Sequence, residues 1–155
     1  MPATLLDDIR QSKPFTSPQH EAMLNVIRTW ATLTDSLEAL LKPYGISGTQ
    51  YNVLRILRGS EPDGLCRNEL RDRMLTRMPD MTRLLDRMED AGLVTRSREG
   101  EDRRMVLTRI TAEGRRLVDE LDDPTREFHK KQLGHMSDEQ LQTLSALLTL
   151  ARHPG

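Results

Sequence analysis

The sequence predicts a mainly α-helical protein that carries a small two- or three-stranded β-sheet. Leucine and methionine dominate the apolar residues, and aromatic residues make up only 3% of the 155 residues. This composition favours helices over a β-sandwich. Apolar residues recur at helical spacing along most of the chain. Between residues 93 and 110 they alternate with polar residues instead, which is typical of a β-hairpin.

Residues 1–17 are polar and interrupted by proline, so we expect an arm or a partly ordered tail. A long helix then begins at Ser17 and Pro18, because serine caps a helix and proline suits its first position. Pro43 ends this helix. Its apolar residues form a heptad-like stripe, with Thr34 in the same register: Met23, Ile27, Trp30, Leu37 and Leu41. Such a stripe needs a partner, from the same chain or from a second copy.

Three shorter helices are expected next. The first begins at a capping box of Ser47 and Gln50, and the second covers about residues 67–74. The third lies in "MPDMTRLLDRMEDAG", residues 78–92, with Thr76 as a candidate N-cap and Pro79 in its first turn. Gly92 ends it. Its buried face should consist of Met81, Leu84, Leu85 and Met88.

The hairpin should pair residues 93–99 with residues 104–110 around a tip at "GED". Thr111 caps a further helix, which Pro124 interrupts or kinks. Ser137 and Gln140 form a second capping box, which opens a last helix. That helix carries a leucine stripe: Leu141, Leu144, Leu147 and Leu148.

Composition limits the possible location and partners. No apolar run is long enough to span a membrane, and the N-terminus lacks the features of a secretory signal. A single cysteine, Cys66, fits a reducing cytoplasm. Residues 67–109 hold eleven arginines, nine acidic residues and no lysine, although the net charge of the chain is −1. This resembles a phosphate-facing module, but charge alone favours an ordinary solvated helix surface.

Three helices followed by a hairpin have the order of a winged helix-turn-helix. In that arrangement the helix at residues 78–92 can enter a DNA major groove. An arginine of the hairpin suits the neighbouring minor groove, where the potential is most negative. An aspartate two residues before that arginine can hold its guanidinium in position.

The stretch "DRRMVLTRITAEG" resembles the wing signature of the MarR family of bacterial transcription regulators. The matching residues, in order, are Asp102, Arg104, Leu107, Thr108 and Gly114. "MTRLLDRMEDAGLVTR" is similar to the family's recognition helix and the following strand, and "ISGTQYNVLRIL" resembles its second helix. The resemblance covers about residues 20–150. Two features depart from it: Pro124 lies where the family has one long linking helix, and Asp80 would face phosphates unfavourably unless it pairs with Arg83 or a cytosine amine.

The resemblance implies a homodimer that binds a palindromic operator in double-stranded DNA as a ligand-responsive repressor. It implies an arm and dimerisation helix at residues 1–42, a DNA-binding domain at residues 43–110, and a linking helix with a C-terminal dimerisation helix at residues 111–155. The N- and C-terminal helices would form a dimerisation bundle. The expected DNA contacts come from Arg67, Asn68, Met78, Pro79, Thr82, Arg83, Arg87, Arg98, Asp102, Arg103 and Arg104.

Family members commonly bind small aromatic acids in a crevice, so Trp30, Tyr44 and Tyr51 are candidates to contact a small aromatic or phenolic effector. Trp30 fits the core of a dimer equally well. Cys66 is a candidate redox-sensing thiol, although a structural cysteine is favoured. The histidines fit no metal site, and neither a cofactor nor catalysis is expected. The alternative is a helical homodimeric scaffold without DNA binding, for which Arg104 behind Asp102 has no evident use.

Overall fold

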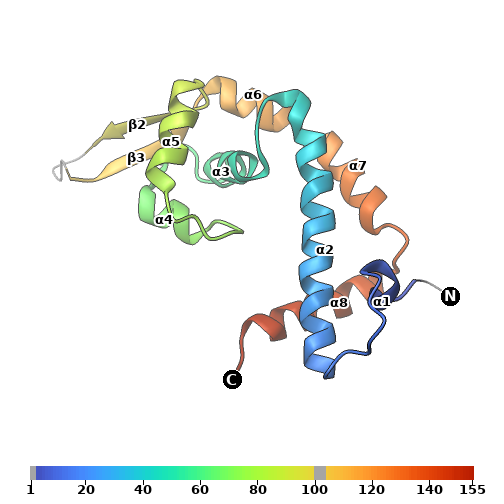
Figure 1. Ribbon diagram of the computed structural model, residues 1–155. Coiled ribbons are helices and arrows are strands. Elements are labelled where there is room, and N and C mark those ends of the chain that lie inside the picture. The colour runs from blue at the N-terminus through green and yellow to red at the C-terminus, as the bar shows by residue number, and fades with distance from the viewer. Residues whose placement is uncertain (1–2, 100–103) are drawn as a thin grey trace. The chain divides into compact units, whose positions relative to one another are not determined.

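The computed structural model describes residues 3–99 and 104–155 (Figure 1). The chain divides into two compact units, residues 1–48 and residues 49–155. Within the described ranges, no helix is both long and apolar enough to cross a membrane.

The first unit contains the helices α1 (Leu5–Asp8), α2 (Pro18–Leu41) and the 3₁₀ helix η1 (Lys42–Tyr44). The expected start of the long helix is confirmed, because the side chain of Ser17 accepts a hydrogen bond from the backbone N–H of His20 at 3.1 Å. The expected arm contains one additional element. The single-turn helix α1 is held by a capping box in which Thr4 and Asp7 satisfy each other's backbone N–H groups.

The apolar stripe of α2 is buried only towards its C-terminal end. Leu41 is fully buried, and Leu37 is half-buried. In contrast, Met23, Ile27 and Trp30 are 62%, 53% and 58% exposed. A large apolar surface therefore remains uncovered on the N-terminal part of α2.

The second unit follows the start of α3 (Gly48–Arg58), which begins at the boundary between the units, and its described residues form eight further helices and strands. These are β1 (Leu65–Cys66), α4 (Arg67–Asp72), α5 (Met81–Asp90), β2 (Val94–Arg98), β3 (Val106–Ile110), α6 (Ala112–Glu120) and α7 (Asp122–Leu133), followed by α8 (Asp138–Arg152). The most deeply buried apolar side chains include Val53, Leu54, Leu57, Leu70, Leu85, Met88, Val94, Val118 and Leu121.

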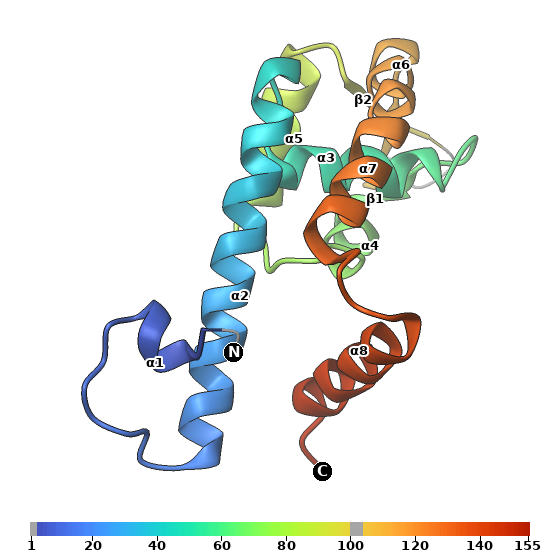
Figure 2. The same cartoon turned by 90° about the vertical axis from the view of Figure 1, so that its right-hand side faces the viewer.

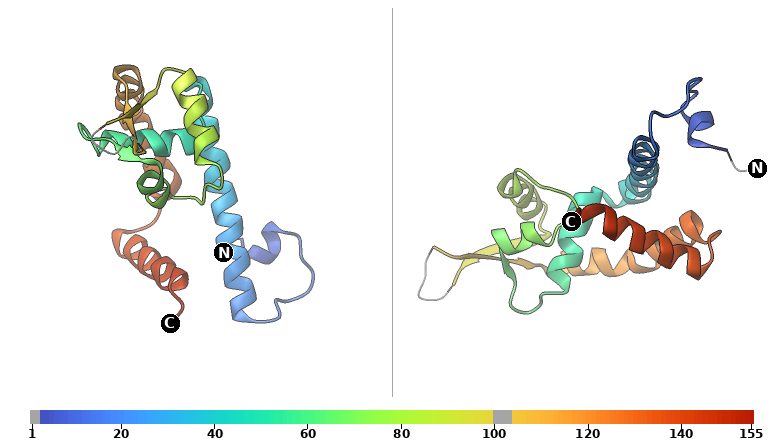
Figure 3. Two further views of the ribbon diagram at one scale, coloured as in Figure 1. Left: turned by 90° about the vertical axis from the view of Figure 1, so that its left-hand side faces the viewer. Right: turned by 90° about the horizontal axis from the view of Figure 1, so that it is seen from below.

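The sheet has three antiparallel strands in the order β1-β3-β2. Val94 pairs with Ile110 and Arg98 with Val106, so the hairpin register spans all five residues of each strand. The two-residue strand β1 adds the third strand, with Leu65 opposite Thr108. Figure 3 shows β2 and β3 projecting from the helices of this unit. The mainly helical fold with a small β-sheet, as predicted, is confirmed.

The start of α5 differs from the prediction. Asp80, rather than Thr76, is the N-cap, and its carboxylate accepts the backbone N–H of Arg83 at 3.0 Å. Pro79 consequently precedes the helix instead of lying in its first turn. The end is as expected: Gly92 has a φ of 75°, and the N–H of Leu93 donates to the carbonyl of Met88 at 3.0 Å.

The predicted interruption near Pro124 is confirmed. Proline has no N–H, so Pro124 cannot donate to the carbonyl of Glu120, four residues earlier. Helix α6 ends at Glu120 and α7 begins at Asp122. Figure 2 shows the chain passing from α6 through α7 to α8. The last helix begins at the predicted capping box of Ser137 and Gln140.

Candidate nucleic-acid interface

Helix α5 has one buried and one polar side. Met81, Leu85 and Met88 are buried, as the spacing predicted, whereas Leu84 is only half-buried. The other side carries three exposed residues that were predicted to contact DNA: Thr82, Arg83 and Arg87. The helix therefore presents two guanidinium groups and a hydroxyl to the solvent.

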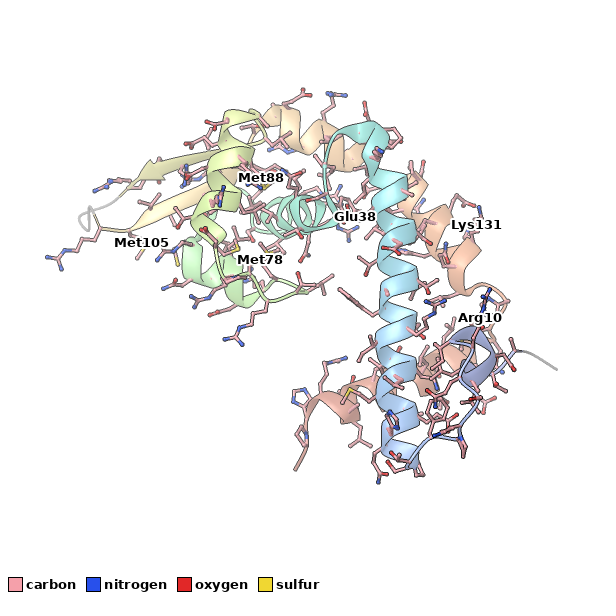
Figure 4. All side chains as sticks on the ribbon, viewed as in Figure 1. Arg10, Glu38, Met78, Met88, Met105 and Lys131 are labelled. Atoms are coloured by element: carbon pink, nitrogen blue, oxygen red, sulfur yellow. The ribbon has the colours of Figure 1, made fainter. Side chains whose placement is uncertain are left out.

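The segment before α5 is shaped by Asp80. Its carboxylate binds the backbone of Arg83, where the free N–H groups of a helix start favour a negative charge. The expected conflict between Asp80 and phosphates is thus reduced by a backbone contact rather than by the guanidinium of Arg83. Pro79 is exposed and Met78 is half-buried in this segment, and Figure 4 shows Met78 beside α4 and α5.

The starts of α4 and α5 are joined by a direct contact. Nη1 of Arg67 donates to the hydroxyl oxygen of Thr82 at 3.0 Å. Because this oxygen accepts from Arg67, the hydroxyl proton of Thr82 can still be donated to a ligand. Asn68 is exposed next to Arg67. Three of the predicted DNA contacts therefore lie close together, although they come from two helices.

A cleft of about 490 Å³ lies beside this contact, between α4, α5 and the sheet. Its described lining includes three guanidinium groups, from Arg67, Arg96 and Arg104, and no carboxylate. The other lining residues are Cys66, Asn68, Thr82, Leu85, Met105, Val106 and Thr108. Figure 4 shows Met105 just before β3. Arginines that line a concave surface suit an anionic ligand such as a phosphate backbone, and Arg67 contributes more to this than Arg96, whose charge is offset by Asp86 and Glu89.

Arg96 on β2 neutralises two carboxylates of α5. Its Nη2 donates to Asp86 at 2.6 Å and to Glu89 at 3.1 Å, and its backbone N–H donates to Glu89 at 2.9 Å. The hydrogen bond from the Arg96 side chain lowers the pKa of Glu89. Helical spacing favours a pair between Asp86 and Arg83, three residues earlier on the same helix, but Asp86 binds Arg96 on β2 instead. The sequence offered no local pattern that would have identified Arg96 as the partner.

A second arginine, Arg109 on β3, holds the far end of β2. It donates to both carboxylate oxygens of Glu99, at 2.6 and 2.8 Å, and to the hydroxyl of Ser97 at 3.1 Å. Hydrogen bonds from Arg109 and Ser97 lower the pKa of Glu99.

The predicted wing contacts are described only in part. Arg98 at the end of β2 and Arg104 before β3 are both exposed. Asp102 and Arg103 lie outside the described residues, so the pairing of Asp102 with Arg104 stays a prediction.

The predicted effector residues belong to different units: Trp30 and Tyr44 to the first, and Tyr51 to the second. A crevice formed by all three therefore stays a prediction. The hydroxyl of Tyr51 donates to Thr125 and accepts from Arg55, both at 3.3 Å. Cys66 is half-buried at the N-cap of α4, and its redox role stays a prediction. Among the residues that the structure describes, no cluster of histidine, cysteine and acidic side chains could hold a metal ion.

Known proteins resemble this chain in both sequence and fold. Residues 44–105 match the sequence model of the MarR family. A MarR transcription factor from Planctomyces limnophilus, of known crystal structure, is 38% identical to the chain. The match covers 88% of this chain and 99% of that one, with a TM-score of 0.68. The chain belongs to the MarR family.

Two other proteins are similar at lower identity. The transcriptional repressor IacR from Pseudomonas putida is 25% identical over 81% of this chain and 74% of its own length. The S. aureus protein MepR, crystallised with DNA, is 23% identical and shares the fold, with a TM-score of 0.73 over 88% of this chain and 96% of that one. As a member of the MarR family, the chain is a DNA-binding transcription regulator with a winged helix-turn-helix fold, and not an enzyme.

Proposed function

We propose that the protein is a homodimeric repressor that binds a palindromic operator and releases it when a small aromatic or phenolic effector binds. The observation that carries the proposal is the polar side of α5, with Arg83 and Arg87 exposed, next to a cleft lined by three arginines. A scaffold protein without DNA binding has no use for cationic groups gathered in this way.

Each part of the surface has a role in the proposal. Thr82, Arg83 and Arg87 on α5 contact base edges or phosphates in the major groove. Residues at the start of α4 and in the segment before α5 fix the register of the protein on the DNA backbone. These are Arg67, Asn68, Met78 and Pro79. The wing residues Arg98, Asp102, Arg103 and Arg104 reach the adjacent backbone and minor groove.

The exposed apolar side chains support the homodimer. The N-terminal part of α2 leaves Met23, Ile27 and Trp30 exposed, and α8 leaves Leu147 and Leu150 exposed at 58% and 70%. A second copy would cover these surfaces and remove them from water. Residues 1–42 and 111–155 would then form the dimerisation part, and residues 43–110 the DNA-binding part.

Repression and effector binding extend the proposal further. The repressor name of IacR supports repression. The aromatic side chains of Trp30, Tyr44 and Tyr51 suit a flat aromatic ligand, and Tyr51 carries a hydroxyl that already exchanges hydrogen bonds with Thr125 and Arg55.

The proposal is tested by measuring the affinity of the purified protein for the intergenic DNA upstream of its own gene, at several salt concentrations. We expect saturable binding to one site, one dimer per palindrome, with an affinity that falls steeply as salt rises. Shuffled DNA of the same length is the control. Equal affinity for both DNAs would contradict an operator-binding function.

A further inference from the structure

One arginine from a different helix holds the break between α6 and α7. Arg58, the last residue of α3, donates from Nη1 to Asp119 of α6 at 2.6 Å. Both of its terminal nitrogens also donate to the carboxylate of Asp122, the first residue of α7, at 2.9 Å each. A single guanidinium therefore joins three helices at the point where the chain changes direction.

This contact is partly shielded from solvent. The Arg58 side chain is 25% exposed, and its fork-shaped guanidinium fixes the orientation of a carboxylate that it binds through two nitrogens. The hydrogen bond from Arg58 lowers the pKa of Asp122, and Asp122 in turn raises the pKa of Arg58. Both groups therefore stay charged at neutral pH.

A second contact between α3 and α7 is made by Tyr51, which lies closer to the start of α3 than Arg58 does. The hydroxyl of Tyr51 donates to that of Thr125, which is only 2% exposed and itself donates to the carbonyl of Leu121 at 2.7 Å. Tyr51 and Arg58 are seven residues apart, so they lie on the same face of α3. The backbone at the junction lacks the hydrogen bond that Pro124 cannot make. Side chains from α3 therefore substitute for a continuous helix.

We propose that Arg58 is a positioning residue that sets which spacing between operator half-sites the dimer accepts. The inference depends on the proposed homodimer and its palindromic operator. Helix α3 belongs to the core that carries α5, through the buried Val53, Leu54 and Leu57, whereas α7 leads into α8, which presents exposed leucines. The angle at the α6–α7 junction thus determines where α5 lies relative to the dimerisation surface.

Operator spacing is a sensitive measure of this angle. Half-sites of a helix-turn-helix dimer are about one DNA turn apart, so one added base pair shifts a half-site by about 3.4 Å and rotates it by about a tenth of a turn. A rigid junction should reject such a change, and a loosened junction should tolerate it. A residue that only stabilises the fold would leave the preferred spacing unchanged.

Arg116 provides a matched control. It lies on α6 and also pairs with two carboxylates, but both of them, Glu113 and Glu120, belong to the same helix. Arg116→Met and Arg58→Met remove the same charge and retain similar side-chain volume. Only Arg58→Met releases contacts that cross the junction.

The experiment uses the full-length protein and the operator located by footprinting on its upstream DNA. Affinities are measured for the native operator, for operators with one base pair removed or added between the half-sites, and for a single half-site. We expect wild type and Arg116→Met to prefer the native spacing by about tenfold or more, whereas Arg58→Met should show about threefold or less, with half-site affinity within about twofold of wild type.

A spacing preference in Arg58→Met equal to that of wild type would overturn the inference. If circular dichroism shows that Arg58→Met does not fold, the same spacing preference is measured on Asp122→Asn. This variant removes one charge of the junction and keeps the side-chain shape, so it should also lose the preference. A wild-type protein without operator binding, or without any spacing preference, would instead contradict the proposed function itself.

Discussion

Asp86 on α5 and Arg96 on β2 form an ion pair of 2.6 Å between Oδ1 and Nη2. The contact joins the polar side of the candidate recognition helix to the first strand of the wing. Glu89, one turn later on α5, binds the same guanidinium. Without Arg96, two carboxylates would face the phosphates of bound DNA without a positive partner.

Replacing Arg96 with Met should therefore lower DNA affinity mainly through exposed negative charge. We expect the free energy of unfolding to fall by only about 1 kcal/mol, because the pair is partly exposed. Adding Asp86→Asn and Glu89→Gln to Arg96→Met should restore part of the DNA affinity. Binding isotherms of the single and triple variants check this, and a triple variant as weak as the single one would argue against an electrostatic role.

The two sides of α5 should separate binding from stability. Leu85→Ala empties a buried site and should lower the free energy of unfolding by about 2–5 kcal/mol. Arg83→Ala should weaken operator binding while leaving the thermal midpoint nearly unchanged, because its side chain is exposed. Thermal unfolding and DNA binding are measured on both variants. An unchanged stability of Leu85→Ala would contradict the helix register.

Dimerisation should depend on the exposed stripe of α2. Ile27→Glu places a charge in that stripe and should shift the protein towards monomer. Asn25→Glu adds the same charge two residues away, on the opposite side of the helix, and should leave the dimer intact. Sedimentation velocity at micromolar concentration distinguishes the two. A stable wild-type monomer under these conditions would contradict the proposed dimer.

Stability should decrease in acid. The pKa values of Glu89, Glu99 and Asp122 are lowered by hydrogen bonds from Arg96, Arg109 and Arg58, respectively. Carboxyl groups with a lowered pKa in the folded state stabilise the fold above their unfolded-state pKa, and this contribution is lost as pH falls through the folded-state pKa. Denaturant unfolding should therefore give a constant free energy from about pH 7 to 5 and a decline below about pH 4.5.

The acid decline should be shallower in Arg58→Met, because the pKa of Asp122 then returns towards its ordinary value. Arg83→Ala is the control, because the three carboxylates named above pair with other arginines. Identical pH profiles of wild type and Arg58→Met would show that the Asp122 pair contributes little to stability.

In the wing, Arg104→Ala should cost most affinity where A·T base pairs narrow the minor groove. Arg103→Ala should instead weaken binding to all sequences and reduce the salt dependence by about one unit per site. Asp102→Ala should weaken binding less than Arg104→Ala and should not add to it in the double variant, because both act through one guanidinium. Additive losses would mean that Asp102 does not position Arg104.

The sequence by itself determined the features that depend on neighbours three or four residues away. The caps at Ser17, Thr111 and Ser137 require only a side chain and the backbone of the next turn. The buried face of α5 follows from apolar spacing, and the helix break follows from the missing N–H of Pro124. The predicted cap of α5 was wrong, because Asp80 caps this helix and Thr76 does not.

Only the tertiary structure decided the contacts between distant elements. Leu65–Cys66 is too short to show strand periodicity, so its place as the third strand depends on β3 being adjacent. Arg58 meets Asp119 and Asp122, which are 61 and 64 residues further along the chain. An arginine in a chain rich in carboxylates has many possible partners, and the packing of α3 against the α6–α7 junction selects these two.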